Sequence, residues 1–324
     1  MSETSIIRKI SQWCEPTKRP SLRLGIGDDA AVLHTHGRPI VFCSDLMIEN
    51  THFDRRFSTP EDVGHKSLAR VLSDVAAMGA EPLAVTVSLA LPRKWESREV
   101  ESFLEHYYAG AVRLALATHT SIAGGDLSRV DGPIVIDVAA TGELFAKSEI
   151  EAWRRTQAKP GDLAFITGPL GAAAFALHEM QAGRIQQIPS DTAARHLRPT
   201  PRFDIARALA HTPVRAAIDI SDSLVQDAAR ICTASNVSLI LNPDLIPCAS
   251  TLDHALYGGD DYELLIVIPA EWAADENART LLAANGITRI GHFETYTPTV
   301  SPNVYLESAT TLRRAIPIEG HDPF

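Results

Sequence analysis

Four short acidic segments constrain this chain most, because each places aspartate beside glycine or a small residue where a strand is expected to meet a loop or helix. They read GIGDDAAV (25–32), SDVAAMGA (73–80), GGD (124–126) and IDISDS (218–223). Two like charges about 4 Å apart repel by roughly 1 kcal/mol in water, and by several times more near a protein surface. Converging carboxylates therefore need cations between them, and oxygen donors without His or Cys favour Mg²⁺. Because Mg²⁺ commonly enters a site with a nucleotide's phosphates, the segments predict phosphoryl transfer.

Length, charge and cysteine content narrow the class of protein. The 324 residues exceed a typical single core and predict two domains. The net charge of −10 disfavours a general nucleic-acid binder, which would present a basic face. No uncharged apolar run approaches 18 residues, the N-terminus lacks an apolar signal core, and the four cysteines form no Cys-x-x-Cys pair. A cytoplasmic protein with free thiols, bound neither to nucleic acid nor to a membrane, is expected.

Strand-like and helix-like segments alternate in the first half of the chain. The run Thr-Pro-Glu-Asp at 59–62 is typical of a helix start, and Gly79 with Pro82 would end that helix. A short strand at 121–123 is expected to deliver the GGD segment as a loop. The other elements expected here are strands at 39–44, 83–91 and 133–141 and a helix at 97–118.

A polar stretch at 146–162 separates two strand runs and predicts a domain boundary, with domains at 1–147 and 148–324. Beyond it, a helix at about 221–236 would begin with Ser221 or Asp222 as its cap. Mixed α/β structure in both domains is the expected fold class, of the α+β type. The other strands expected here are one that begins at 163 and those at 216–220, 237–241, 263–268 and 287–291. The other expected helices are one that begins near 172, one in the Pro-started run 198–210, and one at 271–284.

Phosphate binding would have to use an unusual set of groups. Neither a G-x-x-x-x-G-K-[ST] loop nor the protein-kinase lysine and H-R-D set is present. If ATP is the donor, metals and backbone amides must hold its phosphates. The glycine-flanked turns at 25–29, 124–126 and 168–171 can supply such amides.

Each aspartate also has a structural interpretation. The pair at 28–29 can cap a turn, and Asp126 can be a turn residue. Asp74 lies four residues after Arg70, which suits a salt bridge on a helix surface. Asp222 can simply cap a helix. The joint occurrence of all four segments nevertheless favours the functional interpretation.

The flanking sequences resemble thiamine-monophosphate kinases, members of the superfamily that includes aminoimidazole ribonucleotide synthetase. The matching blocks, which span nearly the whole chain in the family's order, are RLGIGDDAAVL, SDLMIENTHFD, HKSLARVLSDVAAMGAEP, IAGGDLSR, RRTQAKPGD, HLRPTPR, AIDISDSL and YGGDDYELL. The resemblance implies transfer of the ATP γ-phosphoryl group to thiamine monophosphate. It further implies two α/β domains, a nucleotide cleft between them, and a homodimer formed by pairing of the N-terminal sheets.

The resemblance also implies the roles of individual residues. The expected Mg²⁺ ligands, for several ions, are Asp29, Ser44, Asp45, Asp74, Asp126, Asp219 and Asp222. The expected ATP contacts are Tyr108, Gly125, Asp126, Arg155 and Ser221. The expected contacts to the thiamine substrate are His52, Asp260 and Ile318. For Tyr108 the alternative is helix packing.

Direct in-line transfer is the mechanism that this set implies, without catalytic residues beyond the metal ligands. Three positions depart from the family's pattern. Ser223 replaces a glycine, Asp260 replaces a glutamate, and Ile318 stands where an aromatic residue is usual. Two alternatives therefore stay open: an ATP-dependent enzyme of the same fold with a different acceptor, and a nucleotide-binding paralogue without turnover.

Overall fold

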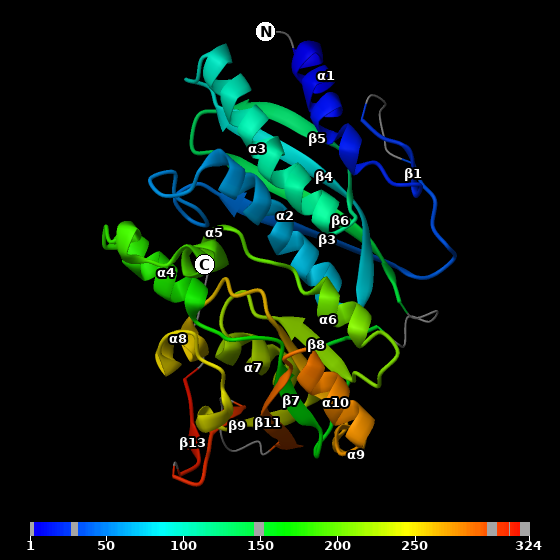
Figure 1. Cartoon of the computed structure of the whole chain (residues 1–324), viewed down its shortest axis with the longest axis vertical. Coiled ribbons are helices and arrows are strands. Elements are labelled where there is room, and N and C mark those ends of the chain that lie inside the picture. Colours follow the sequence, from blue (N-terminus) through cyan, green and yellow to red (C-terminus); the bar gives the residue numbers. More distant parts are fainter. Residues whose placement is uncertain (1–2, 27–31, 146–151, 297–302, 311, 318–324) are drawn as a thin grey trace. The chain divides into compact units, whose positions relative to one another are not determined.

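The computed structural model describes residues 3–26, 32–145, 152–296, 303–310 and 312–317, and it divides into two compact units (Figure 1). Unit 1 comprises Met1–Ala76, Ala80–Ile150 and Leu197–Pro199, and unit 2 comprises Ala77–Gly79, Glu151–His196 and Thr200–Phe324. Each unit has its own sheet and helices, so the expected mixed α/β class is confirmed. None of the described helices is both long and apolar enough to cross a membrane.

Unit 1 is built on a four-stranded sheet in the order β3-β6-β4-β5 (Figure 1). Its strands are β3 (Ile40–Ile48), β4 (Ala80–Pro92), β5 (Ser121–Val130) and β6 (Val135–Leu144), with a separate pair β1 (Leu22–Leu24) and β2 (Val32–Leu33). Its helices are α1 (Glu3–Cys14), η1 (Glu15–Thr17), α2 (Pro60–Ala77) and α3 (Ser97–Ala117). Only the β4–β5 pairing within the four-stranded sheet is parallel.

Among the described residues of unit 1, helices lie against one face of this sheet (Figure 1). Alternate residues of β6, such as Ile136 and Val138, are fully buried, whereas their neighbours are half-buried. The same alternation on β3 leaves Ile40, Phe42 and Leu46 exposed. Figure 1 shows α2 and α3 against one face of the sheet. Because successive strand residues point to opposite faces, the exposed Ile40, Phe42 and Leu46 lie on the other face.

Two glycines let α2 and α3 pack backbone against backbone. A Cβ atom at Gly64 would overlap the carbonyl oxygen of Tyr107, and one at Gly110 would overlap the carbonyl oxygen of Glu61. The contact is therefore reciprocal, with each helix pressing a bare Cα against the backbone of the other. Larger residues at either position would force the helices apart.

Alanine at Gly64 or Gly110 is expected to lower the free energy of unfolding by roughly 1–3 kcal/mol, because the added methyl has no space. Chemical denaturation of the purified variants measures this loss. Gly132→Ala is the matched control, since the nearest atom to its Cβ is 3.9 Å away. Variants at Gly64 and Gly110 as stable as this control would contradict the prediction.

Unit 2 contains a seven-stranded mixed sheet in the order β13-β12-β9-β11-β7-β10-β8. Its strands are β7 (Leu163–Ile166), β8 (Ala216–Asp219), β9 (Val237–Leu241), β10 (Leu264–Ile268), β11 (Thr288–Thr295), β12 (Val304–Leu306) and β13 (Arg314–Ala315). Its helices are α4 (Ala172–Gln181), η3 (Ile185–Gln187), α5 (Ser190–Leu197), α6 (Phe203–Ala208), α7 (Leu224–Ser235), η4 (Pro243–Leu245), α8 (Leu252–Tyr257), α9 (Ala270–Ala273) and α10 (Glu276–Ala284).

The core of unit 2 forms where α7 packs on β8 and β9. Leu224, Ala228 and Ile231 lie one helical turn apart on α7 and are fully buried. Every residue of β9 and β10 is buried, which explains why these strands read as continuous apolar runs rather than as alternating patterns.

The structure corrects several expected elements. The GGD segment is not a loop, because β5 continues from Ser121 to Val130 and includes it. The register of β5 against β4 shifts between Ile122 and Gly124. Gly125 has φ +152°, and a Cβ atom there would lie 1.8 Å from the carbonyl oxygen of Val87. A glycine-containing bulge therefore lets the strand run on where the sequence indicated a turn.

Two expected helices also differ from the structure. The helix expected in 198–210 forms only from Phe203 to Ala208, after the two prolines of the segment. The helix expected at 271–284 is two helices, because Asp275 accepts hydrogen bonds from the backbone N–H groups of Asn277 and Ala278 and so starts α10 afresh.

Candidate functional site

In unit 2 the acidic segment 218–223 forms the end of β8 and the turn into α7. Asp219 is the last residue of β8 and is buried, and Asp222 follows three residues later, half-buried. Ser223 caps α7, since its hydroxyl oxygen accepts a hydrogen bond from the Gln226 N–H at 3.1 Å. The expected cap at Ser221 or Asp222 is therefore wrong, and Asp222 is not occupied in capping this helix.

A buried carboxylate, Asp227, holds this turn in place. Its Oδ2 accepts hydrogen bonds from the backbone N–H groups of Ser221, Asp222 and Ser223 at 3.1, 3.1 and 3.2 Å. Its Oδ1 accepts a hydrogen bond from Arg230, whose other Nη donates to Asp222. The backbone of the turn is thus preorganised from inside the first turns of α7.

The carboxylates around this turn repel one another. Burial, and next the charge of Asp219, raise the pKa of Asp227 to about 7, although Arg230 lowers it. Asp222 raises it further. Asp219, Asp222 and Asp227 thus bring three carboxylates to this turn, and Arg230 forms ion pairs with two of them, Asp222 and Asp227.

A second segment, 258–263, lies beside the turn. The Asp260 N–H donates to the Ser221 carbonyl at 2.8 Å, and the Tyr262 N–H donates to the Ile220 carbonyl at 2.9 Å. Gly259 makes this approach possible, because a Cβ there would lie within 2.8 Å of the carbonyl oxygens of Ser221 and Asp222. An expected ATP contact, Ser221, is therefore hydrogen-bonded to an expected substrate contact, Asp260.

The Asp260 side chain is held on both sides. The backbone of Asp260 is in the left-handed region, with φ +65°. The Tyr262 hydroxyl donates to Oδ1 at 2.8 Å, and Nδ1 of the buried His196 lies 3.6 Å from Oδ2. This shorter carboxylate therefore has a defined position although it replaces the family's usual glutamate.

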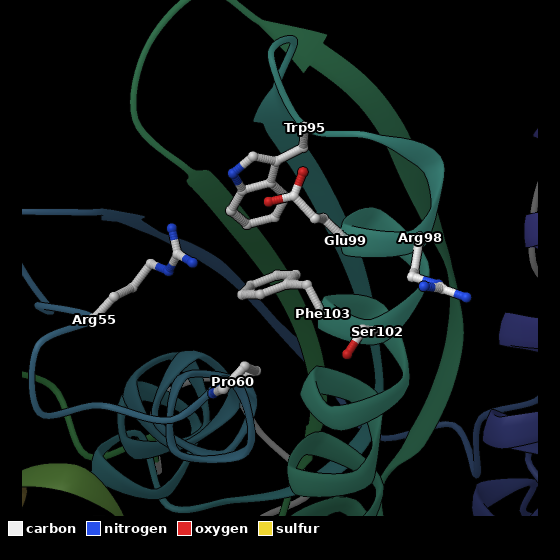
Figure 2. A pocket seen from close by; sticks show the side chains of 7 residues that line it. All are labelled: Arg55, Pro60, Trp95, Arg98, Glu99, Ser102 and Phe103. Atoms are coloured by element: carbon white, nitrogen blue, oxygen red, sulfur yellow. The ribbon is translucent and has the colours of Figure 1, made fainter.

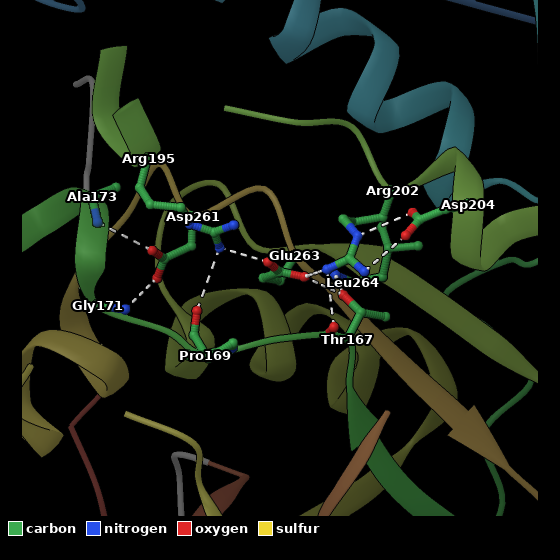
Figure 3. A network of polar contacts seen from close by, with 10 residues as sticks. All are labelled: Thr167, Pro169, Gly171, Ala173, Arg195, Arg202, Asp204, Asp261, Glu263 and Leu264. Carbon is green, nitrogen blue, oxygen red and sulfur yellow. Dashed lines mark hydrogen bonds and ion pairs between the residues drawn. The ribbon is translucent and has the colours of Figure 1, made fainter. Parts of the chain in front are cut away.

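The segment is fixed to the rest of unit 2 by a polar network (Figure 3). The buried Glu263 accepts hydrogen bonds from Arg195 at 2.5 Å and from the Thr167 hydroxyl at 2.6 Å, and it pairs with Arg202. Asp261 accepts from the N–H groups of Gly171 and Ala173, at the start of α4. The network ties 258–263 to the end of β7, to α4, to α5 and to the segment that precedes α6.

In metal-free buffer, the free energy of unfolding is expected to depend on pH through the ionisation of Asp261. Burial raises the pKa of Asp261 to about 7, against the lowering effect of its backbone donors and Arg195. A carboxyl whose pKa is raised by folding stabilises the protein below its unfolded pKa and loses that contribution as pH rises through its folded pKa. Ionisation of Asp261 between pH 5.5 and 8 thus destabilises the wild-type fold.

The asparagine of Asp261→Asn cannot ionise, so the variant should not lose stability through this site as the pH rises. We expect the variant to be less stable than wild type at pH 5.5, and the difference in the free energy of unfolding to shrink by on the order of 2 kcal/mol at pH 8. Urea unfolding at both pH values measures it. A stability difference that is the same at both pH values would contradict the assigned pKa direction.

In unit 1 the expected ligands divide between the two faces of the sheet. Asp45 lies on the helix-covered face, where both of its carboxylate oxygens accept hydrogen bonds from Arg70 of α2 at 2.9 Å. Asp74 lies in the last turn of α2. Ser44 and Asp126 lie on the open face by the register of β3, β6, β4 and β5.

Within the described ranges of the chain, no three His, Cys, Asp or Glu side chains come close enough together to hold a metal ion. The expected ligand set draws on both units and on Asp29, which lies outside the described residues, as does Ile318. Convergence of the four acidic segments at one metal centre therefore stays a prediction.

The remaining expected contacts have varied surroundings. Nδ1 of His52 accepts a hydrogen bond from the Ile48 N–H at 3.0 Å in the turn after β3. Tyr108 is buried, with its ring 6.0 Å from that of Trp13, which matches the packing alternative. Gly125 is exposed in β5, and Arg155 is exposed with its carbonyl accepting from the Ser235 hydroxyl.

A cavity of about 370 Å³ lies in unit 1 away from these residues (Figure 2). Its lining residues are Arg55, Pro60, Trp95, Arg98, Glu99, Ser102 and Phe103. The Arg55 guanidinium lies 4.8 Å from the centre of the Trp95 ring, and 3.6 Å from Glu49. Both charge signs occur around this cavity, so its lining does not define a ligand class.

Sequence reasoning missed Asp227 and Arg230, which organise the turn. A signal was present, because Asp227 falls in the apolar stripe of α7 between Leu224 and Ile231, where a carboxylate is unexpected unless it has partners. Its three backbone donors, however, become visible only when the turn folds over it.

Comparison with known families defines the class of protein. Residues 27–144 match the family model of the AIR synthase related protein N-terminal domain, and residues 159–296 match that of the C-terminal domain. The chain is thus an AIR synthase related protein with both characteristic domains.

Individual relatives identify the family within the class of AIR synthase related proteins. The thiamine-monophosphate kinase of Bacillus subtilis (strain 168) is 34% identical over 306 residues, which cover 90% of this chain and 91% of the relative. The crystal structure of thiamine-monophosphate kinase from Stenotrophomonas maltophilia K279a shares 31% identity with a TM-score of 0.80, covering 95% of this chain and 97% of that one. AaThiL complexed with AMPPCP and TMP shares 27% identity with a TM-score of 0.74, covering 99% and 97%. The chain belongs to the thiamine-monophosphate kinase family.

Proposed function

We propose that this protein transfers the γ-phosphoryl group of ATP to thiamine monophosphate and so forms thiamine diphosphate and ADP. The observation that carries the proposal is the hydrogen bond between Asp260 and Ser221, which joins the expected substrate segment to the expected nucleotide turn. The similarity over 99% of the chain to AaThiL complexed with AMPPCP and TMP supports both ligands.

Direct in-line transfer suits these ligands. A phosphate oxygen of thiamine monophosphate is already anionic at neutral pH, so the acceptor needs no strong general base. When bound, Mg²⁺ would neutralise the phosphates and stabilise charge on the equatorial oxygens. The protein's own part is to hold the carboxylates in place, through Asp227 on the nucleotide side and through Tyr262 and His196 on the substrate side.

Roles are proposed by motif for the residues at the site. Residues 1–147 would form an N-terminal domain that binds ATP and metal and forms the dimer, and residues 148–324 would form a C-terminal α/β domain. The proposed Mg²⁺ ligands are Asp29, Ser44, Asp45, Asp74, Asp126, Asp219 and Asp222. The proposed ATP contacts are Tyr108, Gly125, Asp126, Arg155 and Ser221, and the proposed substrate contacts are His52, Asp260 and Ile318.

We further propose a homodimer in which the open face of the unit 1 sheet meets the same face of a second copy. Phe42 leaves 72% of its surface exposed, and Ile40 and Leu46, also exposed, stand on the same face of β3. A row of exposed apolar residues on one strand face is typical of a self-complementary interface. The cytoplasm is the proposed location, in keeping with four free cysteines.

An assay with ATP, Mg²⁺ and thiamine monophosphate tests the proposed reaction. Chromatography should show thiamine diphosphate and ADP in equal amounts, and neither without the acceptor. Turnover with a different acceptor alone would identify another enzyme of the same fold. ATP binding without any turnover would instead indicate a non-catalytic paralogue, and either result would overturn the proposal.

A further inference from the structure

Residues 195–202, RHLRPTPR, form a strap that the proposed reaction leaves without a role. Its two outer arginines bind the same carboxylate of unit 2. Nη2 of Arg195 and Nη1 of Arg202 each lie 2.5 Å from a different oxygen of Glu263, which is buried. The base of the strap is therefore closed on a single buried acid.

The tip of the strap belongs to unit 1. The chain leaves unit 2 after His196, contributes Leu197–Pro199 to unit 1, and returns to unit 2 at Thr200. A segment of three residues thus packs with one unit, while the residues on both sides of it belong to the other.

Two contacts within unit 1 hold the tip on the first turns of α2. Nε of Arg198 lies 2.5 Å from Oδ1 of Asp62, and Nε2 of His65 lies 2.8 Å from the Pro199 carbonyl oxygen. A carbonyl oxygen only accepts, so the imidazole donates from Nε2. Asp62 is buried, and its Oδ2 accepts from the N–H and the hydroxyl of Thr59. Loss of the arginine would leave a buried carboxylate without the cation that now pairs with it.

Proline makes the strap stiff between its tip and its base. Pro199 and Pro201 are both buried, and each ring fixes its own φ near −65°. Each proline also restricts the residue that precedes it. The backbone of the strap therefore has few conformations, and a displacement of the tip is carried to the base.

We propose that the strap couples the order of segment 258–263 to the docking of its own tip on α2. The base holds Glu263, the last residue of that segment, and the segment is in turn hydrogen-bonded to the turn that follows β8. Release of Arg198 from Asp62 frees the tip and loosens the contacts of the base. The coupling goes beyond the proposed reaction and does not depend on it.

Hydrogen–deuterium exchange measured by mass spectrometry tests the coupling without any turnover. Arg198→Gln removes the charge at the tip and keeps a polar side chain. The backbone N–H groups of 258–263 should then exchange about tenfold faster than in wild type, because local opening of the segment becomes easier. Arg198→Lys keeps the charge and should exchange within about threefold of wild type.

Arg113→Gln is the matched control. Arg113 donates from α3 to Glu61, the acid beside Asp62 on α2, at 3.0 Å, and it is not part of the strap. This variant should leave exchange in 258–263 unchanged. The double variant Asp62→Asn, Arg198→Gln should exchange no faster than Arg198→Gln, because the contact between the two side chains is already lost.

The site of faster exchange decides between coupling and general destabilisation. Wild-type exchange in 258–263 of Arg198→Gln would overturn the inference, and so would an acceleration that is equal in β9, in the core of unit 2. Equal acceleration in Arg113→Gln or Arg198→Lys would overturn it as well. If thermal unfolding shows that Arg198→Gln is not folded, His65→Phe removes the other contact of the tip, and the same outcomes apply to it. Failure of the thiamine monophosphate assay would overturn the proposed function and leave the coupling standing.

Discussion

Replacing Asp222 with asparagine is expected to lower kcat for thiamine monophosphate phosphorylation on the order of 10²- to 10³-fold, because one anchor for charge stabilisation at the transferred group is lost. Folding should be affected far less. Ser223 rather than Asp222 caps α7, and the Asp222 N–H can still donate to Asp227. The free energy of unfolding should change by no more than about 1 kcal/mol. Steady-state kinetics and urea unfolding of the same preparation measure the two quantities.

Asp275→Asn is the matched control for this variant. Asp275 also precedes a helix of unit 2, and asparagine retains an oxygen that accepts the N–H groups of Asn277 and Ala278. Its kcat should stay at the wild-type value. An Asp222→Asn enzyme with near-normal turnover, or one whose lost activity follows lost folding, would refute the metal-ligand role.

Phe42→Asp is expected to break the homodimer, with a rise in the dimer dissociation constant of roughly 30- to 1000-fold. Phe42 is the most exposed of the apolar residues on the open face of the unit 1 sheet, and a carboxylate buried there would have no partner. Sedimentation velocity over a range of protein concentrations measures the shift from dimer to monomer.

Leu116→Asp serves as the control for the interface. Leu116 is 40% exposed on α3, the helix that covers the opposite face of the same sheet. This variant should keep the association state of wild type. Equal behaviour of the two variants, or a wild-type protein that is already monomeric, would rule out this face as the interface.

Local sequence signals predicted many of the elements well. The Thr59-Pro60 start of α2 is confirmed, with Glu61 and Asp62 in its first turn and Gly79 just beyond its end. Strands β3, β4 and β6 lie where their apolar runs indicated them, although each ends farther along the chain than expected, and β3 and β6 also begin later. These signals depend on propensity and capping, which act within a few residues.

The errors arise where a contact outside the motif itself decides the local structure. The glycines of 124–126 indicated a turn, but pairing with β4 continues the strand through them. The acidic run 219–222 indicated a cap, but the three N–H groups of 221–223 bind Asp227 instead. The first contact is tertiary, whereas Asp227 lies only four to six residues beyond the N–H groups that it binds.

The sequence by itself determined which residues this protein can use: oxygen donors in four acidic segments, glycines beside them, and the order of blocks that places the chain in its family. Only the tertiary structure decided how those residues are held. It paired Asp45 with Arg70 and Asp222 with Arg230, and it set Asp260 against Ser221. The physical reason is that carboxylate chemistry is a property of the residue, whereas the charge and hydrogen bonds around it depend on which other residues the folded chain brings to it.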